Sequence, residues 1–195
     1  MGNNTIRRMC LDGVLVGLFL VLGLLRIRVG TFLEIGLGTI VIVIAAISLG
    51  LWDAVAIAAL GEFMNQVFFS SYGLTPTTPL WVLPVVVRAL IIGVVAVLYR
   101  RKGDSLVKHK VLYFITILGA ALVISGLDTA ILYLDGIIMG YPVAYTWAQT
   151  GIRFLTSQIT AIIVAILTIP LHNAVSYLLP AKNKKAEASD ASAQK

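Results

Sequence analysis

The sequence predicts an all-α integral membrane protein, a bundle of six transmembrane helices with both termini in the cytoplasm. Three observations carry this prediction: the apolar composition, the recurrence of long apolar segments and the distribution of Lys and Arg. The chain of 195 residues is 59% hydrophobic and 12% charged, whereas a soluble domain averages about 25% charged residues. Helices are expected because a span must satisfy its backbone hydrogen bonds internally, and the apolar runs lack the alternation of barrel strands.

Six apolar segments are close to the roughly 20 residues that a helix needs to cross a bilayer, although the second and third are somewhat short. The predicted spans are residues 10–26, 34–50, 53–71, 80–99, 111–134 and 143–178. The last span contains Pro170, where we expect a kink or break, with the remainder along the cytoplasmic surface. The spans form one transmembrane domain over residues 1–180, followed by a disordered cytoplasmic tail over residues 181–195.

The distribution of Lys and Arg orients the bundle, because cytoplasmic loops of membrane proteins carry an excess of these residues. With the N-terminus inside, the outer loops carry only Arg26 and Arg28. The basic residues that then fall on the cytoplasmic side are Arg7, Arg8, Arg100, Arg101, Lys102, Lys108, Lys110, Lys182, Lys184 and Lys185. These flanking positions account for the net charge of +6 without a nucleic-acid partner.

The sequence offers little support for an enzyme. It has no P-loop, no HExxH motif and no nucleophile elbow. Its one cysteine, Cys10, excludes an internal disulfide and a cysteine-based metal cluster, and we interpret it as a small packing residue. We therefore expect no catalytic residue, no metal and no cofactor.

Three charged residues lie inside apolar segments on three different spans: Glu62, Arg88 and Arg153. At about 1.5 Å per residue, each falls near the middle of the bilayer. A charge in lipid costs from about 3 to more than 10 kcal/mol, so these groups should face one another, a cavity or a ligand. Two compatible interpretations follow: a structural Glu62–Arg88 ion pair that joins spans three and four, and a polar cavity that binds a ligand.

Further polar residues gather in the outer half of spans three to six, which predicts a pocket that opens outward. Gln149 precedes Arg153 by four residues, so both lie on one face of span six. An aromatic belt also explains Trp81, and a turn also explains Thr77. The candidate ligand-binding residues are Glu62, Asn65, Gln66, Thr77, Trp81, Arg88, Asp128, Gln149 and Arg153.

Span one carries a small-residue pattern, because Gly13 and Gly17 are four residues apart in GVLVG. Such a pair lets another helix approach closely. The same pattern also occurs by chance in small membrane proteins, so it indicates only a candidate contact face.

With these features the chain resembles the substrate-binding S components of energy-coupling factor (ECF) vitamin transporters. The resemblance covers nearly the whole chain: its length, six helices, cytoplasmic termini, basic loop between spans four and five, outward polar pocket and small-residue face on span one. The segments LGEFMNQVFFSSYGLTPTTPLWVLPVVVRALIIG and GIRFLTSQITAIIVAILTIPL look like stretches of that superfamily.

The resemblance implies a mechanism and partners. An S component in a bacterial plasma membrane captures a vitamin from outside and docks on a transmembrane T component with two cytoplasmic ATPases, so ATP hydrolysis belongs to the partners. The loop after span one, RIRVGTFLEIG with Arg26, Arg28 and Phe32, would act as a lid. Docking would use span one, where the family has AxxxA and this chain has Gly13 and Gly17.

The residues of the predicted pocket favour pantothenate among the vitamins. Two arginines suit a carboxylate, while Asn65, Gln149 and the threonines suit amide and hydroxyl groups. Few aromatic residues lie at this depth to stack on a flat ring, so hydroxymethylpyrimidine or pyridoxine comes next and folate after them. Two other classes stay open: an autonomous small transporter or channel, and a structural membrane subunit in which Glu62 and Arg88 only hold helices together.

Overall fold

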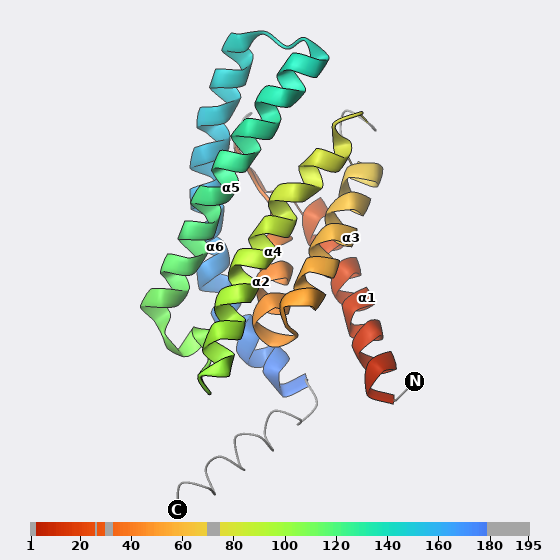
Figure 1. Cartoon of the computed structure of the whole chain (residues 1–195), viewed down its shortest axis with the longest axis vertical. Coiled ribbons are helices and arrows are strands. Elements are labelled where there is room, and N and C mark those ends of the chain that lie inside the picture. Colours follow the sequence, from red (N-terminus) through yellow and green to blue (C-terminus); the bar gives the residue numbers. More distant parts are fainter. Residues whose placement is uncertain (1–2, 26, 30–32, 70–74, 179–195) are drawn as a thin grey trace, which may run out of the picture.

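The structure is a computed structural model that describes residues 3–25, 27–29, 33–69 and 75–178. The described part forms a bundle of six α-helices with a short β-hairpin (Figure 1). The helices are α1 (Asn3–Leu24), α2 (Thr39–Ser48), α3 (Leu51–Phe69), α4 (Thr78–Arg101), α5 (Lys110–Met139) and α6 (Val143–Leu178). Strands β1 (Ile27–Val29) and β2 (Leu33–Ile35) form the hairpin, and a 3-10 helix, η1 (Leu106–Lys108), precedes α5.

The start of α1, the connection from α4 to α5 and the end of α6 lie at one end of the bundle, which we call the basal end (Figure 1). The turn between α5 and α6 lies at the opposite, apical end. Gly140 ends α5 there with a φ of 73°, a left-handed conformation that favours glycine. The helical part of the chain thus begins and ends on one side of the bundle, while the prediction that this side faces the cytoplasm stays a prediction.

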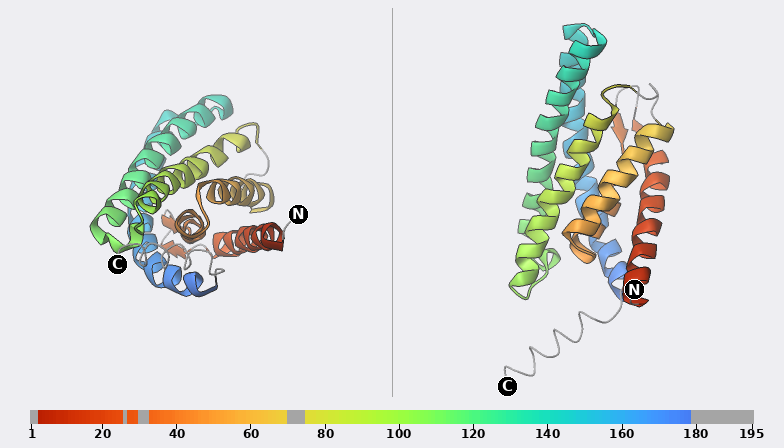
Figure 2. Two further views of the ribbon diagram at one scale, coloured as in Figure 1. Left: turned by 60° about the horizontal axis from the view of Figure 1, so that its bottom comes forward. Right: turned by 45° about the vertical axis from the view of Figure 1, so that its right-hand side comes forward.

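Helix α2 occupies the centre of the bundle. Its residues 40–47 are all buried, and it contacts α1, α3, α4 and α6. Figure 2 shows the other helices around it. With 10 residues, α2 is about 15 Å long, or about half the thickness of a bilayer core. It is therefore packed among other helices instead of forming a full span of its own.

The predicted span over residues 34–50 is wrong in its first part. Leu33–Ile35 form β2, which pairs antiparallel with β1 so that Arg28 lies opposite Glu34. Gly36 and Gly38, with their poor helix propensity, separate β2 from α2. The hairpin could not be recognised from the sequence, because strands of three residues are too short to show an alternating pattern.

Three of the described helices are long and apolar enough to cross a membrane: Thr78–Arg101, Lys110–Met139 and Val143–His172. The six-span topology as a whole stays a prediction. The predicted break at Pro170 does not occur, because α6 continues through this residue to Leu178. Proline is tolerated in membrane helices where nearby groups satisfy the freed backbone carbonyl. Figure 1 shows the last turns of α6 running obliquely beneath α2.

Two glycines allow α3 to pack closely against α1 and α4. A Cβ at Gly61 of α3 would lie 2.6 Å from Phe19 Cδ1 of α1, and a Cβ at Gly93 of α4 would lie 2.6 Å from Leu51 Cδ1 of α3. Both distances are too short for a carbon–carbon contact, so a larger residue would require Phe19 or Leu51, or the helix that carries it, to shift. These contacts fix α3 between α1 and α4, and thereby position the polar face of α3.

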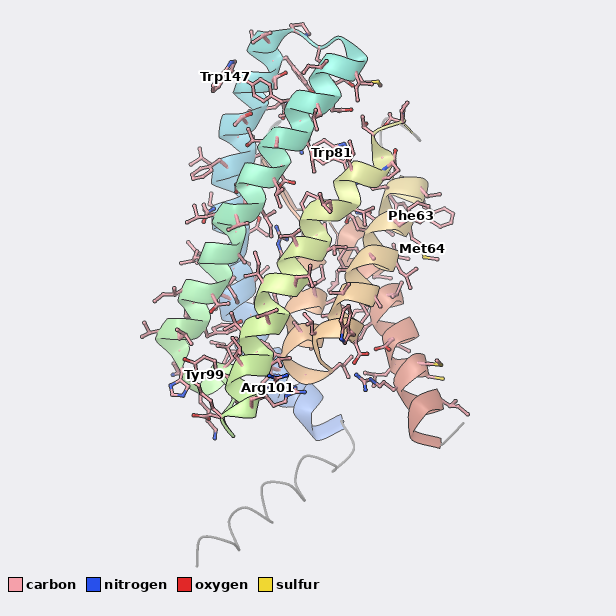
Figure 3. The ribbon with its side chains drawn as sticks, viewed as in Figure 1. Phe63, Met64, Trp81, Tyr99, Arg101 and Trp147 are labelled. Atoms are coloured by element: carbon pink, nitrogen blue, oxygen red, sulfur yellow. The ribbon has the colours of Figure 1, made fainter. Side chains whose placement is uncertain are left out.

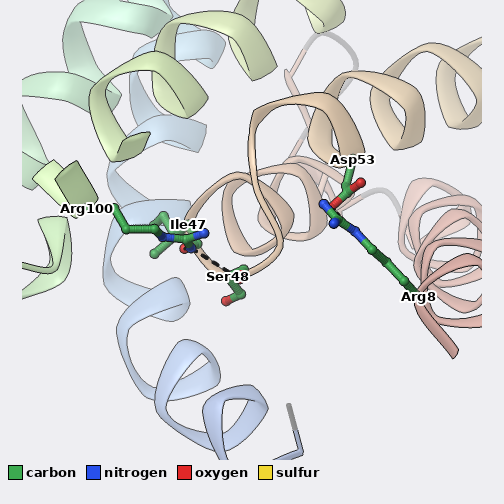
Figure 4. A network of polar contacts seen from close by, with 5 residues as sticks. All are labelled: Arg8, Ile47, Ser48, Asp53 and Arg100. Atoms are coloured by element: carbon green, nitrogen blue, oxygen red, sulfur yellow. Dashed lines mark hydrogen bonds and ion pairs between the residues drawn. The ribbon is translucent and has the colours of Figure 1, made fainter. Parts of the chain in front are cut away.

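Polar side chains tie the helices together at the basal end (Figure 4). Arg8 of α1 forms an ion pair with Asp53 of α3. Arg100 of α4 donates from Nη2 to the carbonyl oxygens of Ile47, at 2.7 Å, and Ser48, at 3.2 Å. These carbonyls end α2, where a cation also interacts favourably with the helix dipole. The basal end of α2 is thus held by a charge from a neighbouring helix.

The connection from α4 to α5 is organised by Asp104. Its carboxylate accepts a hydrogen bond from the Ser105 backbone N–H at 2.8 Å, and it pairs with His109 at 2.8 Å and Lys108 at 3.3 Å. The Ser105 N–H, followed by His109 and Lys108, lowers the pKa of Asp104 to about 2. This basic loop therefore contains one carboxylate that is held by its neighbours in sequence.

Candidate functional site

Glu62, Asn65 and Gln66 form a polar cluster on α3. Gln66 Nε2 donates to Glu62 Oε1 at 2.7 Å, and Asn65 Nδ2 donates to Glu62 Oε2 at 3.3 Å. The structure brings these residues together as their spacing of three and four residues predicts. Glu62 is only 8% exposed, so amide groups of its own helix hold its carboxylate inside the bundle.

Arg88 of α4 is directed toward α2, where its Nη1 donates to Thr39 Oγ1 at 2.7 Å. The ion pair with Glu62 that one interpretation of the sequence requires is not formed between these two described residues; Glu62 instead accepts from Asn65 and Gln66. Glu62 and Asp128 still lie close enough to interact electrostatically with the Arg88 guanidinium. Arg88 therefore has a hydroxyl group as its direct partner and carboxylates at longer range.

Two predicted site residues meet across the bundle. The guanidinium of Arg153 on α6 lies over the ring of Trp81 on α4, with 4.7 Å between its central carbon and the ring centroid, which is a cation–π contact. Figure 3 shows Trp81 on the apical part of α4, on the side that faces α5. Asp128 of α5 interacts electrostatically with both Arg153 and Arg88. Charges on α4, α5 and α6 therefore act on one another.

Thr77 and Gln149 have different surroundings. Thr77 is 1% exposed and donates to Asp135 Oδ1 of α5 at 2.6 Å. This bond joins the start of α4 to the apical part of α5, so Thr77 has a structural partner in the described chain. Gln149 is half-buried and lies one turn before Arg153 on α6. The structure thus leaves Gln149 beside the arginine as predicted, and places Thr77 at a helix junction.

A small cavity lies among α2, α4, α5 and α6. Its polar lining consists of Thr39, Arg88, Ser157 and Thr160, and the rest of its lining is apolar. The cavity is large enough for one water molecule. Ser157 Oγ is buried and has no hydrogen-bond partner among the residues that the structure describes. The cavity therefore offers polar groups that the surrounding protein does not fully satisfy.

Thr39, Ser157 and Thr160 were not predicted as site residues. Ser157 follows Arg153 by four residues, so its place on the same face of α6 could have been recognised from the spacing. Thr39 gave no such signal, because its contact with Arg88 depends on how α2 and α4 are rotated about their axes. Sequence periodicity alone does not determine that rotation between two helices that are apolar on most sides.

One face of α1 is turned away from the bundle. Gly13 and Gly17 are exposed, and a Cβ at either position would meet no atom of the described structure within 4 Å. Met9, Val14 and Leu18 are exposed beside them. The face therefore combines apolar side chains with two open positions at which another helix could approach the α1 backbone.

Two of the three predicted lid residues, Arg26 and Phe32, lie outside the described residues. The third, Arg28, lies in β1 with its backbone opposite Glu34 of β2. β2 also contacts α6. The hairpin after α1 is thus packed against the helix that carries Arg153.

The structure changes the interpretation of Cys10, which is a free cysteine exposed on α1 and not a packing residue. Across the described ranges, no group of three or more His, Cys, Asp and Glu side chains is placed to hold a metal ion. The polar groups that the bundle gathers are arginines, amides and hydroxyls, which can bind a polar organic molecule but are poor ligands for transition metals.

A comparison with protein families identifies a match over most of the chain. The family model described as "ECF transporter, substrate-specific component" matches residues 7–172. The matched range runs from the first turns of α1 to His172 in α6, and so includes the α3 cluster, the Trp81–Arg153 contact and the cavity. No curated protein matches the chain.

Proposed function

The chain belongs to the family of ECF transporter substrate-specific components, and from this we propose that it captures a vitamin from outside the cell, with pantothenate as the first candidate. The vitamin passes inward through a complex with a transmembrane T component and two cytoplasmic ATPases. The chain lies in the plasma membrane of a bacterium with both termini in the cytoplasm, and its role is to bind the substrate.

The observation that supports a ligand most strongly is the state of two arginines: Arg88, which is half-buried among the helices, and Arg153, which is exposed on α6. Arg88 bonds to the hydroxyl of Thr39, and Arg153 contacts the ring of Trp81. Neither forms an ion pair with a carboxylate in the part of the chain that the structure describes. A cation at this depth costs at least about 3 kcal/mol unless it is compensated. A ligand with a negative charge would offset that cost and would be favoured for the same reason.

Pantothenate fits this arrangement by its chemistry. It is small, and it carries a carboxylate, an amide and two hydroxyl groups. An arginine binds a carboxylate through strong, charge-assisted hydrogen bonds. Gln149, one turn from Arg153, supplies an amide for the polar groups along the rest of the molecule.

Hydroxymethylpyrimidine, pyridoxine and folate are the next candidates. Each carries a flat ring, which would gain from stacking on an aromatic side chain. Trp81 is the aromatic residue at the candidate site, and Arg153 covers its ring. A flat vitamin would have to displace Arg153 first, which is why these candidates follow pantothenate.

We place the docking surface for the T component on the exposed face of α1. Gly13 and Gly17 are open, and the neighbouring Met9, Val14 and Leu18 are exposed and apolar. In a membrane, helices associate through close backbone approach at small residues. The hairpin at Arg28 is proposed as part of the lid, because β2 contacts α6 beside the candidate site.

A thermal-shift screen of the purified full-length protein against a panel of vitamins tests this function. A ligand that binds the folded state stabilises it by about 2.7 kcal/mol at 100 times its Kd, so one vitamin should raise the unfolding temperature. Liposomes with this chain alone should show no ATP-driven uptake, and adding the T component and ATPases should establish it. Two outcomes would contradict the proposal. One is folded protein whose unfolding temperature no vitamin raises, and the other is sustained flux through the chain alone.

A further inference from the structure

We infer that the cavity among α2, α4, α5 and α6 is the subsite for a carboxylate of the ligand, held by Arg88, Thr39 and Ser157. The inference rests on the proposed function and assigns one end of the pocket to named groups. Two of these groups, Thr39 and Ser157, were not among the binding residues predicted from the sequence.

The cavity lies on the same helix faces as the Trp81–Arg153 contact. Trp81 and Arg88 are seven residues apart on α4, or about two turns, and Arg153 and Ser157 are four apart on α6. Both helices run from the apical to the basal end (Figure 1). The cavity is therefore about 6 to 10 Å deeper in the bundle than the cation–π contact, at about 1.5 Å per residue.

Arg88 has donors available for an anion. A guanidinium has five N–H donors in a planar fork, and among the described residues its side-chain hydrogen bond is the one to Thr39. That bond fixes the position of the guanidinium at the wall of the cavity, next to α2. The remaining N–H groups suit the two oxygens of a carboxylate, which an arginine can bind through two parallel hydrogen bonds.

Ser157 faces the same space from α6. Its Oγ is buried and has no partner in the described chain, and it lines the cavity together with Arg88. A buried hydroxyl without a hydrogen bond costs about 1 to 3 kcal/mol. Donation to a carboxylate oxygen would remove this cost, and the same oxygen would also accept from Arg88.

The apolar part of the lining strengthens these interactions. Val43, Ile92, Ile117, Ala121 and Ala161 complete the walls. In such surroundings a charged hydrogen bond is stronger than in water, because the effective dielectric constant is lower. The available space, enough for about one water-sized group, excludes a ring.

The geometry defines a class of ligand. It is a small carboxylic acid whose other polar groups lie about 6 to 10 Å from the carboxylate, at the level of Arg153 and Gln149. The Arg153–Trp81 contact lies on the apical side of the cavity, so Arg153 is available to bond to those further polar groups.

Isothermal titration of the full-length protein with pantothenate and with pantothenol tests the inference, because pantothenol has an alcohol in place of the carboxylate. The wild type should prefer pantothenate by at least about tenfold, the value of a charge-assisted hydrogen bond. Arg88→Gln should abolish this preference while leaving the weaker binding of pantothenol. Arg101→Gln, at the exposed basal end of the same helix, is the matched control and should retain the wild-type ratio.

Ser157→Ala provides a second variant that does not depend on the stability of Arg88→Gln. Ser157 has no described partner to lose, so the variant should fold as the wild type does and should weaken pantothenate binding by about fivefold. Ser157→Leu should fill the cavity and reduce the binding of pantothenate far more than that of pantothenol.

The outcomes separate this inference from the proposed function. If pantothenate binds and its preference over pantothenol survives in both Arg88→Gln and Ser157→Leu, the subsite is wrong and the function stands. If the protein binds only vitamins without a carboxylate, the same conclusion follows. If folded wild-type protein binds no vitamin, the proposed function fails and the subsite fails with it.

Discussion

Charged residues have different kinds of partner at the basal end of the bundle and in its middle. At the basal end, Arg8 pairs with Asp53, and Arg100 bonds to the carbonyls that end α2. In the middle, Arg88 has only a hydroxyl as its side-chain partner in the described chain, and Arg153 lies on an aromatic ring.

The difference separates charges that hold helices from charges that are available to a ligand. An ion pair offsets much of the cost of taking two charges out of water, whereas an arginine at membrane depth without a carboxylate in direct contact is offset less. Basal charges should therefore matter for stability and little for binding. The central arginines should matter for binding more than for stability. Variants at Arg153, Arg100 and Asp104 test this contrast, and a variant of α1 tests the docking face.

The largest effect is expected on transport. Replacing both Gly13 and Gly17 by Leu should reduce vitamin uptake in the reconstituted complex to background, because the added side chains prevent close approach of a partner helix to α1. Ligand binding by the isolated protein should be unchanged. Gly126→Leu is the matched control, since Gly126 is also exposed with open space around it, on α5. Uptake at the wild-type rate in the double variant would remove α1 as the docking face.

A smaller effect, about tenfold on ligand affinity, is expected for Arg153→Ala, which removes the value of a charge-assisted hydrogen bond. Calorimetry measures the affinity, and expression and unfolding temperature report on the fold. Arg153→Lys should recover part of the affinity, because it keeps the charge and loses the planar fork. Affinity equal to the wild type in Arg153→Ala would place Arg153 outside the site.

The opposite pattern is expected for Arg100→Gln. The variant removes the cation that bonds to Ile47 O and Ser48 O, which should lower the free energy of unfolding by about 1 to 2 kcal/mol. Arg101→Gln should change it by less than about 0.5 kcal/mol, as expected for a surface position. Denaturant titration measures both, and affinity for the vitamin should stay constant. A loss of affinity without a loss of stability would reverse the assignment of the basal charges.

The smallest effect is expected from Asp104, whose pKa is lowered to about 2, first by the Ser105 N–H and then by His109 and Lys108. A depressed pKa stabilises the folded state above the ordinary pKa of 3.8, and this contribution disappears as the pH falls through about 2. The unfolding temperature of Asp104→Asn should thus lie slightly below that of the wild type at pH 5, and the two should converge near pH 2. A constant difference across this range would show that the carboxylate interactions do not stabilise the loop.

Sequence reasoning was most successful within single helices. The grouping of Glu62 with Asn65 and Gln66 follows from spacings of three and four residues, and the structure shows both hydrogen bonds. The long apolar helices α4, α5 and α6 were recognised for the same reason, because length and composition are local properties. Both kinds of feature depend on neighbours in sequence.

Contacts between different helices could not be predicted from spacing along the sequence. The depth of Arg88 could be estimated, but its bond to Thr39 depends on helix rotation and on α2 being short. The hydrogen bond of Thr77 with Asp135 spans 58 residues and has no local signature. Strand β1 was predicted as part of the loop after span one, and only the end of β2, Glu34 and Ile35, was predicted as part of span two.

The most direct test of the central claim, that Arg88 and Arg153 serve a ligand, is calorimetric titration of wild-type protein with carboxylic-acid vitamins and with their neutral analogues. The account predicts saturable binding of one carboxylic acid at one molecule per chain, with weaker binding of its neutral analogue. Folded protein that binds none of these acids, or that binds acid and neutral analogue equally, would contradict it.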